Sequence, residues 1–453
     1  MKYQLAILGG GPAGYTAAEK ASKAGMDVVL FEQNALGGTC LNVGCIPTKT
    51  LLYSAKQYYN ATHADKYGVK AENVTFDYAK IVQRKQKVVR KLVAGIKQKL
   101  NNEHCTVVTG SAAVVSRTDE AVVMTCNGEQ YEAENLLICT GSVNFVPPIP
   151  GVKDNPAVWD STDALAATQL PQSMIIVGGG VIGMEFAAVF STFGVEVTVI
   201  EYCKEILPPF DKDVAKRLKT VLSKRGIKII TSAAVNGITK GDDGYTVSYE
   251  LKGKPQSVTC EKVLMSVGRQ PVLPQGLDAV GVTVGRRSIE VDDNMMTNVP
   301  GVYAIGDVNG RMMLAHAASA QGQRALHAIL GKADDIKLDI VPSAVFTVPE
   351  LAMVGLTEEQ CAERGMDVTV KKSFFRSNGK AVAMNETDGL LKMIVDNATR
   401  QIVGCHICGA HAADLIQEVV TAMNAGATVD LLARSIHGHP TLSEVMLTAA
   451  RQF

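Results

Sequence analysis

Two cysteines five positions apart, Cys40 and Cys45, have the clearest potential for chemistry in this sequence. They lie in the segment GGTCLNVGCIPTK at 37–49. In a regular helix this separation places the Cα atoms roughly 8–9 Å apart and on different faces, whereas a disulfide requires less than about 7 Å. Bridging therefore requires an irregular loop or a tightened first helical turn, which the glycines of the segment make available. The alternative is two unrelated buried thiols.

Length and composition set broad limits on the fold and the partners. At 453 residues the chain predicts two to four domains. Lys plus Arg and Asp plus Glu both number 45, so no global field attracts nucleic acid or an anionic membrane, and we expect neither as a partner. Ten cysteines without an export signal do not form a disulfide framework. A disulfide kept in such a chain is expected to serve catalysis or sensing.

No targeting or membrane segment is evident. The opening MKYQLAILGGGPAG has no apolar h-region followed by a small-residue cleavage site. The most apolar later stretch, MIIVGGGVIGMEFAAVF, is interrupted by glycines and by Glu185, whereas a membrane span requires about 20 uninterrupted apolar residues. We therefore expect a cytoplasmic protein.

An internal repeat must position the cysteines. QLAILGGGPAGYTAAEKASKAGMDVVLFE and SMIIVGGGVIGMEFAAVFSTFGVEVTVIE both predict an apolar strand, a glycine turn, an amphipathic helix, a second strand and an acid. The first glycine precedes the closing acid by 23 positions in each copy, from Gly9 to Glu32 and from Gly178 to Glu201. Two dinucleotide-binding units of the Rossmann type are therefore predicted.

The glycines and acids of the repeat have separate tasks. The first glycine permits the tight turn, the second lets the backbone approach a pyrophosphate, and the third lets the helix lie close to the strand. The closing acid can accept hydrogen bonds from an adenosine ribose. A carboxylate at Glu201 favours the free 2′-hydroxyl of NAD and repels the 2′-phosphate of NADP, although the nearby Lys204 could soften this preference.

The predicted fold class is α/β, with two Rossmann-like dinucleotide-binding domains and a C-terminal α+β domain; the family resemblance stated below implies that these are FAD/NAD(P)-binding domains and a dimerisation domain. We place the FAD-binding domain at 1–148, where NFVPPIPG supplies a proline-rich boundary, and the NAD-binding domain at 149–270. A central domain at 271–340 completes the FAD site, and the interface domain is 341–453, with LLKMIVD as a strand and AADLIQEVVTAMNAG as a helix. The basic stretch from Lys80 to Lys99 predicts a long helix with a solvated face.

On these residues the sequence resembles the pyridine nucleotide-disulfide oxidoreductases over essentially its whole length, and most of all their dihydrolipoamide dehydrogenase branch. The resemblance implies FAD in the first unit and NAD in the second. It implies that Cys45 stacks against the flavin and that Cys40 exchanges with the substrate dithiol. Lys49 would lie close to the isoalloxazine ring, with Glu185 as its buried charge partner.

The resemblance also extends to cofactor contacts. ICTGS resembles the turn where the chain leaves the first FAD segment, and GVYAIGD resembles the strand ending in the acid that binds the ribitol chain. No metal ligands are predicted. The implied cofactor-binding residues are Gly9, Gly11, Pro12, Ala13, Gly14, Glu32, Gly38, Thr39, Lys49, Thr140, Gly141, Gly306, Asp307, Leu314, Ala315 and His316 in the FAD segments, and Gly178, Gly180, Ile182, Gly183, Glu201 and Gly268 in the NAD unit.

The segment HGHPTLSE at 437–444 supplies a base. Thiol–disulfide exchange proceeds through thiolates, and oxidation of a dithiol releases protons. Histidine titrates in the required range, and a carboxylate partner can orient its ring. By resemblance His439 is the base and Glu444 its partner, and both reach the active site from the second subunit of a homodimer. Gly438 stands where alanine is common in the family, which can loosen this loop.

Alternative assignments remain at this stage. Cys405 and Cys408 form a C-x-x-C spacing, but their alternating strand pattern favours packed, structural thiols. A glutathione- or mercuric-type reductase is the nearest alternative enzyme, although the chain ends in TAARQF without a cysteine pair and has Glu201 where those relatives carry basic residues. The second alternative is a flavoprotein that acts mainly as a structural subunit.

The resemblance also implies a partner, which is either a lipoyl-bearing acyltransferase of a 2-oxo acid dehydrogenase complex or the lipoyl carrier of glycine cleavage.

Overall fold

The computed structural model describes residues 2–242 and 244–453 and divides into two compact units. The first unit joins Met1–Thr50, Ala79–Phe145 and Arg269–Leu338, and the second joins Leu51–Tyr78, Val146–Gly268 and Asp339–Phe453. Each unit therefore draws on segments that are far apart in the sequence. The finer division at 148, 270 and 340 stays a prediction.

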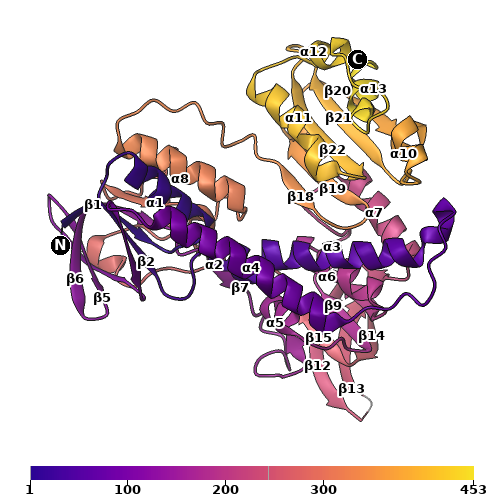
Figure 1. The fold of residues 1–453 in the computed structure, drawn as a ribbon, viewed down its shortest axis with the longest axis horizontal. Coiled ribbons are helices and arrows are strands. Elements are labelled where there is room, and N and C mark those ends of the chain that lie inside the picture. The colour runs from indigo at the N-terminus through magenta and orange to yellow at the C-terminus, as the bar shows by residue number, and fades with distance from the viewer. Residues whose placement is uncertain (1, 243) are drawn as a thin grey trace. The chain divides into compact units, whose positions relative to one another are not determined.

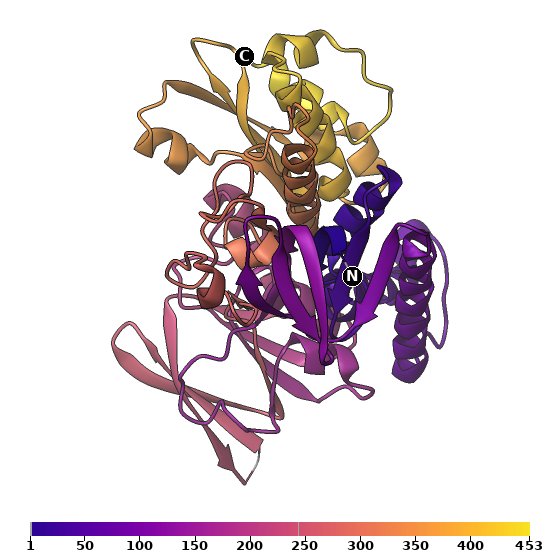
Figure 2. The ribbon, with the colours of Figure 1, turned by 90° about the vertical axis from the view of Figure 1, so that its left-hand side faces the viewer.

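A large sheet forms the centre of the first unit (Figure 1). Its central strands are continuous apolar runs such as VVLF, which is typical of parallel strands covered on both faces. The purple strands of this sheet lie toward the viewer in Figure 2. The strands, in sheet order, are β3 (Cys105–Thr109), β2 (Val28–Glu32), β1 (Lys2–Leu8), β6 (Glu129–Ile138), β5 (Val122–Cys126) and β4 (Ala113–Arg117), with β17 (Val302–Ala304) also pairing with β6.

Helices α1 (Pro12–Lys23) and α8 (Ala315–Ile329) lie side by side in this unit (Figure 1). Their contact buries small side chains such as Ala17, Ala18 and Ala325, so the two backbones come close and the late segment packs against the first helix. The other helices that begin in this unit or run through it are α2 (Gly38–Val43), α3 (Cys45–Thr62) and α4 (Tyr78–Leu100).

Helix α4 confirms the predicted basic helix, with one correction. Ile96 and Leu100 are buried in the core and most of the cations are exposed, as the periodicity predicts. Lys85, however, is buried, and burial lowers the pKa of its ammonium. The solvated face of the helix therefore excludes this lysine.

The second unit contains the second dinucleotide repeat. Its parallel sheet has the order β11 (Lys228–Ile230), β10 (Glu196–Ile200), β9 (Ser173–Val177), β15 (Lys262–Met265) and β8 (Val158–Trp159). An antiparallel sheet of β12 (Ala233–Gly241), β13 (Gly244–Leu251) and β14 (Lys254–Cys260) shares one apolar core with the parallel sheet. The helices here are α5 (Ser161–Ala166), α6 (Val181–Thr192) and α7 (Lys212–Lys224).

The C-terminal part of the second unit is an antiparallel sheet covered by helices, as the α+β prediction requires (Figure 1). Cys405 and Cys408 lie on its central strand and are fully buried, which confirms them as packed residues of a strand. The elements are β18 (Ser343–Val345), β19 (Glu350–Gly355), β22 (Ile402–Gly409), β21 (Leu390–Asp396), β20 (Val368–Phe374), α9 (Glu358–Glu363), α10 (Gly379–Ala383), α11 (Ala412–Asn424), α12 (Val429–Arg434) and α13 (Glu444–Ala450).

Among the helices of the two described ranges, none has the length and apolar character needed to cross a bilayer.

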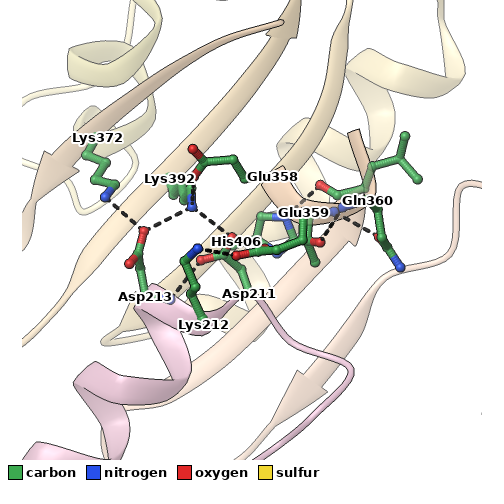
Figure 3. Close-up of polar contacts among 11 residues, drawn as sticks. Asp211, Lys212, Asp213, Glu358, Glu359, Gln360, Lys372, Lys392 and His406 are labelled. Carbon is green, nitrogen blue, oxygen red and sulfur yellow. Dashed lines mark hydrogen bonds and ion pairs between the residues drawn. The ribbon is translucent and has the colours of Figure 1, made fainter. Parts of the chain in front are cut away.

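A buried ion cluster joins helix α7 to this C-terminal sheet (Figure 3). The Lys392 side chain is 0% exposed, and its Nζ lies 2.9 Å from Asp211 Oδ2, 2.9 Å from Asp213 Oδ2 and 2.5 Å from Glu358 Oε2. The three donors of the ammonium thus meet three carboxylates. Burial alone would lower the pKa of Lys392, but the hydrogen bonds to Glu358, Asp211 and Asp213 outweigh it and raise that pKa.

We expect Lys392→Met to destabilise the protein by about 3–5 kcal/mol, because it leaves the fully buried Asp211 carboxylate without its cation. Lys372→Met is the matched control, since Lys372 pairs with Asp213 at 2.8 Å but its side chain is 40% exposed, and it should cost less than about 1 kcal/mol. Urea unfolding of the two variants measures the difference. Equal losses would contradict the assignment of the stabilisation to the buried lysine.

Candidate active site and cofactor turns

The first glycine turn has the geometry of a pyrophosphate cradle. It connects β1 to α1, and a Cβ on Gly14 would overlap the carbonyl oxygen of Gly9, so only glycine lets the helix lie this close. Gly11 is the N-cap of α1 and provides no side-chain cap, which leaves the first amides of the helix available to an anion. Pro12 and Ala13 open the same helix. These residues fit a dinucleotide.

Glu32, at the end of β2, has a second task that the sequence did not reveal. Its Oε2 accepts a hydrogen bond from Gly10 N at 2.8 Å, and its Oε1 accepts one from Asn34 N at 2.7 Å. The carboxylate therefore stabilises the conformation of the glycine turn by a hydrogen bond to its backbone. Each oxygen keeps a further lone pair, so the predicted bond to a ribose hydroxyl stays compatible with this arrangement.

The second repeat has the same arrangement in the second unit. Glu201 is buried, with Oε2 accepting from Gly179 N at 2.5 Å and Oε1 accepting from Cys203 N at 2.6 Å. A Cβ on Gly183 would overlap the carbonyl oxygen of Gly178, whereas a Cβ on Gly180 would meet nothing within 4 Å. Gly180 is the uncapped start of α6, whose first turn includes Ile182. This turn also fits a dinucleotide.

Gly268 follows the loop that closes the second turn. Just before it, Ser266 Oγ donates to the carbonyl oxygen of Gly178 at 2.9 Å. This contact holds the loop after β15, which also contains Gly268, against the glycine turn. Its role in binding NAD stays a prediction.

Cys40 and Cys45 lie together at a break between two helices. Cys40 is in α2 and Cys45 begins α3, with Gly44 between them in a non-helical conformation. Both residues carry thiols here, and a hydrogen bond with Cys45, followed by burial, raises the pKa of the Cys40 thiol. The irregular path that pairing requires is therefore present, because the chain interrupts the helix.

The cysteine segment packs directly against the first glycine turn. Gly37 N donates to the carbonyl oxygen of Gly10 at 2.8 Å. A Cβ on Gly38 would lie 2.7 Å from the Cα of Gly11, so the two backbones meet where a side chain would not fit. Thr39 and the cysteines follow immediately in the chain. The structure thus brings the predicted thiol pair to the predicted FAD turn.

Two side chains extend this site. Lys49, one turn into α3, lowers the pKa of Cys40 through its charge, although the thiol pair dominates. Tyr15 of α1 was not foreseen from the sequence. Its phenol pKa is raised by burial and then by the charges of Cys40, Glu19 and Cys45. The signal for it was its place one residue after Gly14, on the helix that the cysteine segment contacts.

The remaining predicted FAD contacts lie on the segments that return to the first unit. Gly141 has φ of 72°, and the neighbouring Ser142 Oγ donates to Asp307 Oδ2 at 2.5 Å. Gly306 begins a short 3-10 turn (Gly306–Asn309), which is separated from β17 by Ile305. The structure therefore brings ICTGS and GVYAIGD together through the Ser142–Asp307 bond, and their contacts with FAD stay a prediction. Thr140 directly precedes Gly141 in ICTGS. Leu314 is the N-cap of α8, and Ala315 and His316 are the first two residues of that helix.

The two histidines of HGHPTLSE have separate partners in the second unit. His439 Nδ1 lies 3.0 Å from Glu444 Oε1, and its side chain is 77% exposed. A hydrogen bond from Thr441 N, and then the bond with His439, lower the pKa of the Glu444 carboxyl. A proton on Nδ1 directed at this carboxylate leaves Nε2 as the basic nitrogen. His437 Nε2 instead contacts Glu418 Oε1 at 2.8 Å.

Glu185 is buried in α6, where its Oε1 accepts a hydrogen bond from Phe346 N at 3.1 Å. It belongs to the second unit, whereas Lys49 belongs to the first. The pairing of the two charges stays a prediction.

Comparison with known families decides the relationship. Residues 3–322 match the pyridine nucleotide-disulphide oxidoreductase model, and residues 341–450 match the dimerisation domain of the same family. The chain belongs to the pyridine nucleotide-disulphide oxidoreductases. The family resemblance and the fold class predicted from the sequence are thereby confirmed, as is an FAD-dependent, NAD-linked enzyme class.

Relatives in the family match over nearly the whole chain. The dihydrolipoyl dehydrogenase of Bacillus subtilis is 40% identical over 98% of this chain and 95% of its own, and that of Geobacillus stearothermophilus is 39% identical over 98% and 94%. Among solved structures, the HOCl-induced flavoprotein disulfide reductase RclA of Escherichia coli aligns with a TM-score of 0.87 at 33% identity, covering 99% of each chain. LpdA of Mycobacterium tuberculosis aligns with a TM-score of 0.91 at 26% identity, also covering 99% of each.

Changing Gly180 or Gly183 of the second turn to alanine should affect different properties, namely NAD binding and stability. Gly183→Ala should destabilise the fold by more than about 2 kcal/mol, because its Cβ overlaps backbone. Gly180→Ala should leave stability and FAD content unchanged but weaken NAD binding, because its Cβ enters the space of the ligand. Thermal unfolding and NAD titration separate the two outcomes. Gly180→Ala with unaltered NAD affinity would remove this turn as the NAD site.

Proposed function

We propose that the protein is a dihydrolipoyl dehydrogenase, which oxidises protein-bound dihydrolipoamide to lipoamide and transfers the electrons to NAD⁺. The observation that carries this proposal is the thiol pair Cys40–Cys45 held against the FAD glycine turn. The 39–40% identity to curated dihydrolipoyl dehydrogenases over 98% of the chain supports the choice of substrate.

The thiol chemistry requires Cys40 and Cys45 to form a disulfide in the oxidised enzyme. A thiolate of dihydrolipoamide attacks the Cys40 sulfur, the S–S bond breaks, and Cys45 leaves as a thiolate. The second substrate thiolate then attacks the mixed disulfide, which releases lipoamide and leaves both cysteines reduced. FAD held at the Gly9–Gly14 turn would supply the chemistry that takes these two electrons from the cysteines and delivers them to NAD⁺ as a hydride. The two half-reactions predict ping-pong kinetics.

His439 is proposed to accept the proton of the attacking dithiol. Its Nδ1 faces Glu444, so Nε2 carries the basic lone pair, and the carboxylate stabilises the ring once it is protonated. The exposure of this ring suits a base that serves a site formed with another subunit. We propose a homodimer in which His439 and Glu444 complete the site of the partner, consistent with the dimerisation-domain match.

The proposed partner is the protein that carries the lipoyl group. Either a 2-oxo acid dehydrogenase acyltransferase or the lipoyl carrier of glycine cleavage presents the required dithiol. We propose that these reactions take place in the cytoplasm. We also propose that the chain has four domains, with boundaries near residues 148, 270 and 340.

A glutathione- or mercuric-type reductase running in the opposite direction is the alternative. The likeness to RclA, solved as a flavoprotein disulfide reductase, gives this alternative some support. Against it, Glu201 directly follows β10, where a carboxylate disfavours NADPH, and its hydrogen bond from Gly179 N fixes it there. The direction of turnover with dihydrolipoamide and NAD⁺ discriminates between the two.

Cys45→Ser tests the thiol pair. We expect the variant to retain FAD, because the glycine turn is untouched, and to lose oxidation of dihydrolipoamide by NAD⁺ completely, because no disulfide can form. Flavin absorbance and a steady-state assay measure these properties. Unchanged turnover would refute the proposed function, as would a wild-type protein that holds FAD but cannot couple dihydrolipoamide to NAD⁺.

His439→Gln tests the base. The dithiol half-reaction should slow by roughly 10²-fold or more, while the exchange of electrons between NADH and the flavin stays nearly unchanged. Stopped-flow kinetics resolves the two half-reactions. His437→Gln is the matched control, because His437 has its own partner in Glu418 and should leave the dithiol step close to wild type. Equal slowing of both half-reactions in His439→Gln would indicate a damaged fold.

Glu201→Gln tests the nucleotide preference. Loss of the charge should narrow the ratio of kcat/KM for NAD⁺ over NADP⁺, because the repulsion of a 2′-phosphate disappears. Glu205→Gln removes the same charge four positions later and should leave the ratio unaltered. A Glu201→Gln ratio equal to that of wild type would exclude this carboxylate as the selector.

A further inference from the structure

Arg269 makes a fixed set of polar contacts in the first compact unit. It begins β16 (Arg269–Pro271), which pairs antiparallel with β7 (Ser142–Asn144). Its Nε donates to Ser142 Oγ at 2.7 Å, its Nη2 to the carbonyl oxygen of Ser142 at 2.6 Å, and its Nη1 to Asn144 Oδ1 at 2.7 Å. Three acceptors around a planar guanidinium leave it little freedom to rotate.

These contacts decide where the Ser142 hydroxyl points. Ser142 is 7% exposed, and its Oγ donates to Asp307 Oδ2 at 2.5 Å. A serine hydroxyl has one proton and two lone pairs. Because Arg269 Nε already occupies a lone pair, the single proton is committed to Asp307. Donation therefore runs in one direction, from Arg269 through Ser142 to the Asp307 carboxylate.

The turn that carries Asp307 is held independently. Gln321 Oε1, from α8, accepts from Gly306 N at 2.8 Å and from Asn309 Nδ2 at 2.9 Å. These bonds fix the backbone of the Gly306–Asn309 turn, whereas the Ser142 bond fixes the side chain of Asp307. The position of the backbone and the orientation of the carboxylate thus depend on different residues.

We propose that Arg269 is a positioning residue for FAD: it orients Asp307 through the Ser142 hydroxyl. With Oδ2 held by Ser142, the carboxylate cannot rotate freely, and its remaining lone pairs would accept hydrogen bonds from the hydroxyls of the ribityl chain. A carboxylate free to rotate would lose side-chain entropy on binding, and FAD affinity would fall. This inference rests on the proposed FAD-dependent function. It adds Arg269, which is not among the predicted FAD-contacting residues, to the residues that determine FAD affinity.

The test measures FAD affinity of apoprotein variants by flavin fluorescence. Ser142→Ala removes the relay and should weaken FAD binding roughly 10–100-fold, as the loss of a hydrogen bond to a charged group predicts. Ser142→Thr retains the hydroxyl and should recover most of the affinity. Arg269→Gln should weaken binding in the same direction as Ser142→Ala. Arg311→Gln is the matched control in the same unit, since Arg311 bonds to the carbonyl oxygen of Val291, and it should bind FAD like wild type.

A double-mutant cycle separates positioning from a general structural effect. In an Asp307→Asn background, Arg269→Gln should cost little more, because the carboxylate that it orients is already gone. Additive losses of FAD affinity, or a Ser142→Ala variant that binds FAD like wild type, would overturn the inference. A wild-type protein that binds no FAD would overturn the proposed function instead, and thermal unfolding of each apoprotein identifies variants that simply fail to fold.

Discussion

The site depends on the close approach of two stretches of backbone in the first unit. Gly37 donates to the carbonyl oxygen of Gly10, and Gly38 meets Gly11 where no side chain fits. This approach fixes the segment that leads into Cys40 and Cys45 against the turn that is shaped for a pyrophosphate. A larger residue at Gly38 would push the cysteine segment away from the first glycine turn, so the proposed redox site requires glycine at this position.

The acids of the two repeats, Glu32 and Glu201, make matching hydrogen bonds. Glu32 and Glu201 each accept one hydrogen bond from a backbone amide of the glycine turn and one from a backbone amide just after the acid itself. A single carboxylate therefore supports the turn, and the predicted bond to an adenosine ribose would use its remaining lone pairs. The matched 23-residue spacing reflects this geometry, because the acid must lie at or just after the end of the second strand, beside the glycine turn that follows the first strand. The repeat is a physical requirement of two similar cradles.

The local parts of the site could be predicted from the sequence, because they depend on spacing along one segment. The glycine turns, the strands around them, the α4 helix and the buried Cys405 and Cys408 follow from periodicity. Long-range partners could not be predicted, because no pattern in one segment names its contact in another. The Lys392 cluster, the pairing of His437 with Glu418 and the place of Tyr15 beside the thiols are of this kind.

The central claim is that a thiol pair and a flavin store electrons together, and an anaerobic reductive titration tests it most directly. The oxidised wild-type protein should take up about four electrons per bound FAD, two for the flavin and two for the Cys40–Cys45 disulfide. Cys40→Ser should take up about two. A wild-type protein that accepts only the two electrons of the flavin would contradict the account.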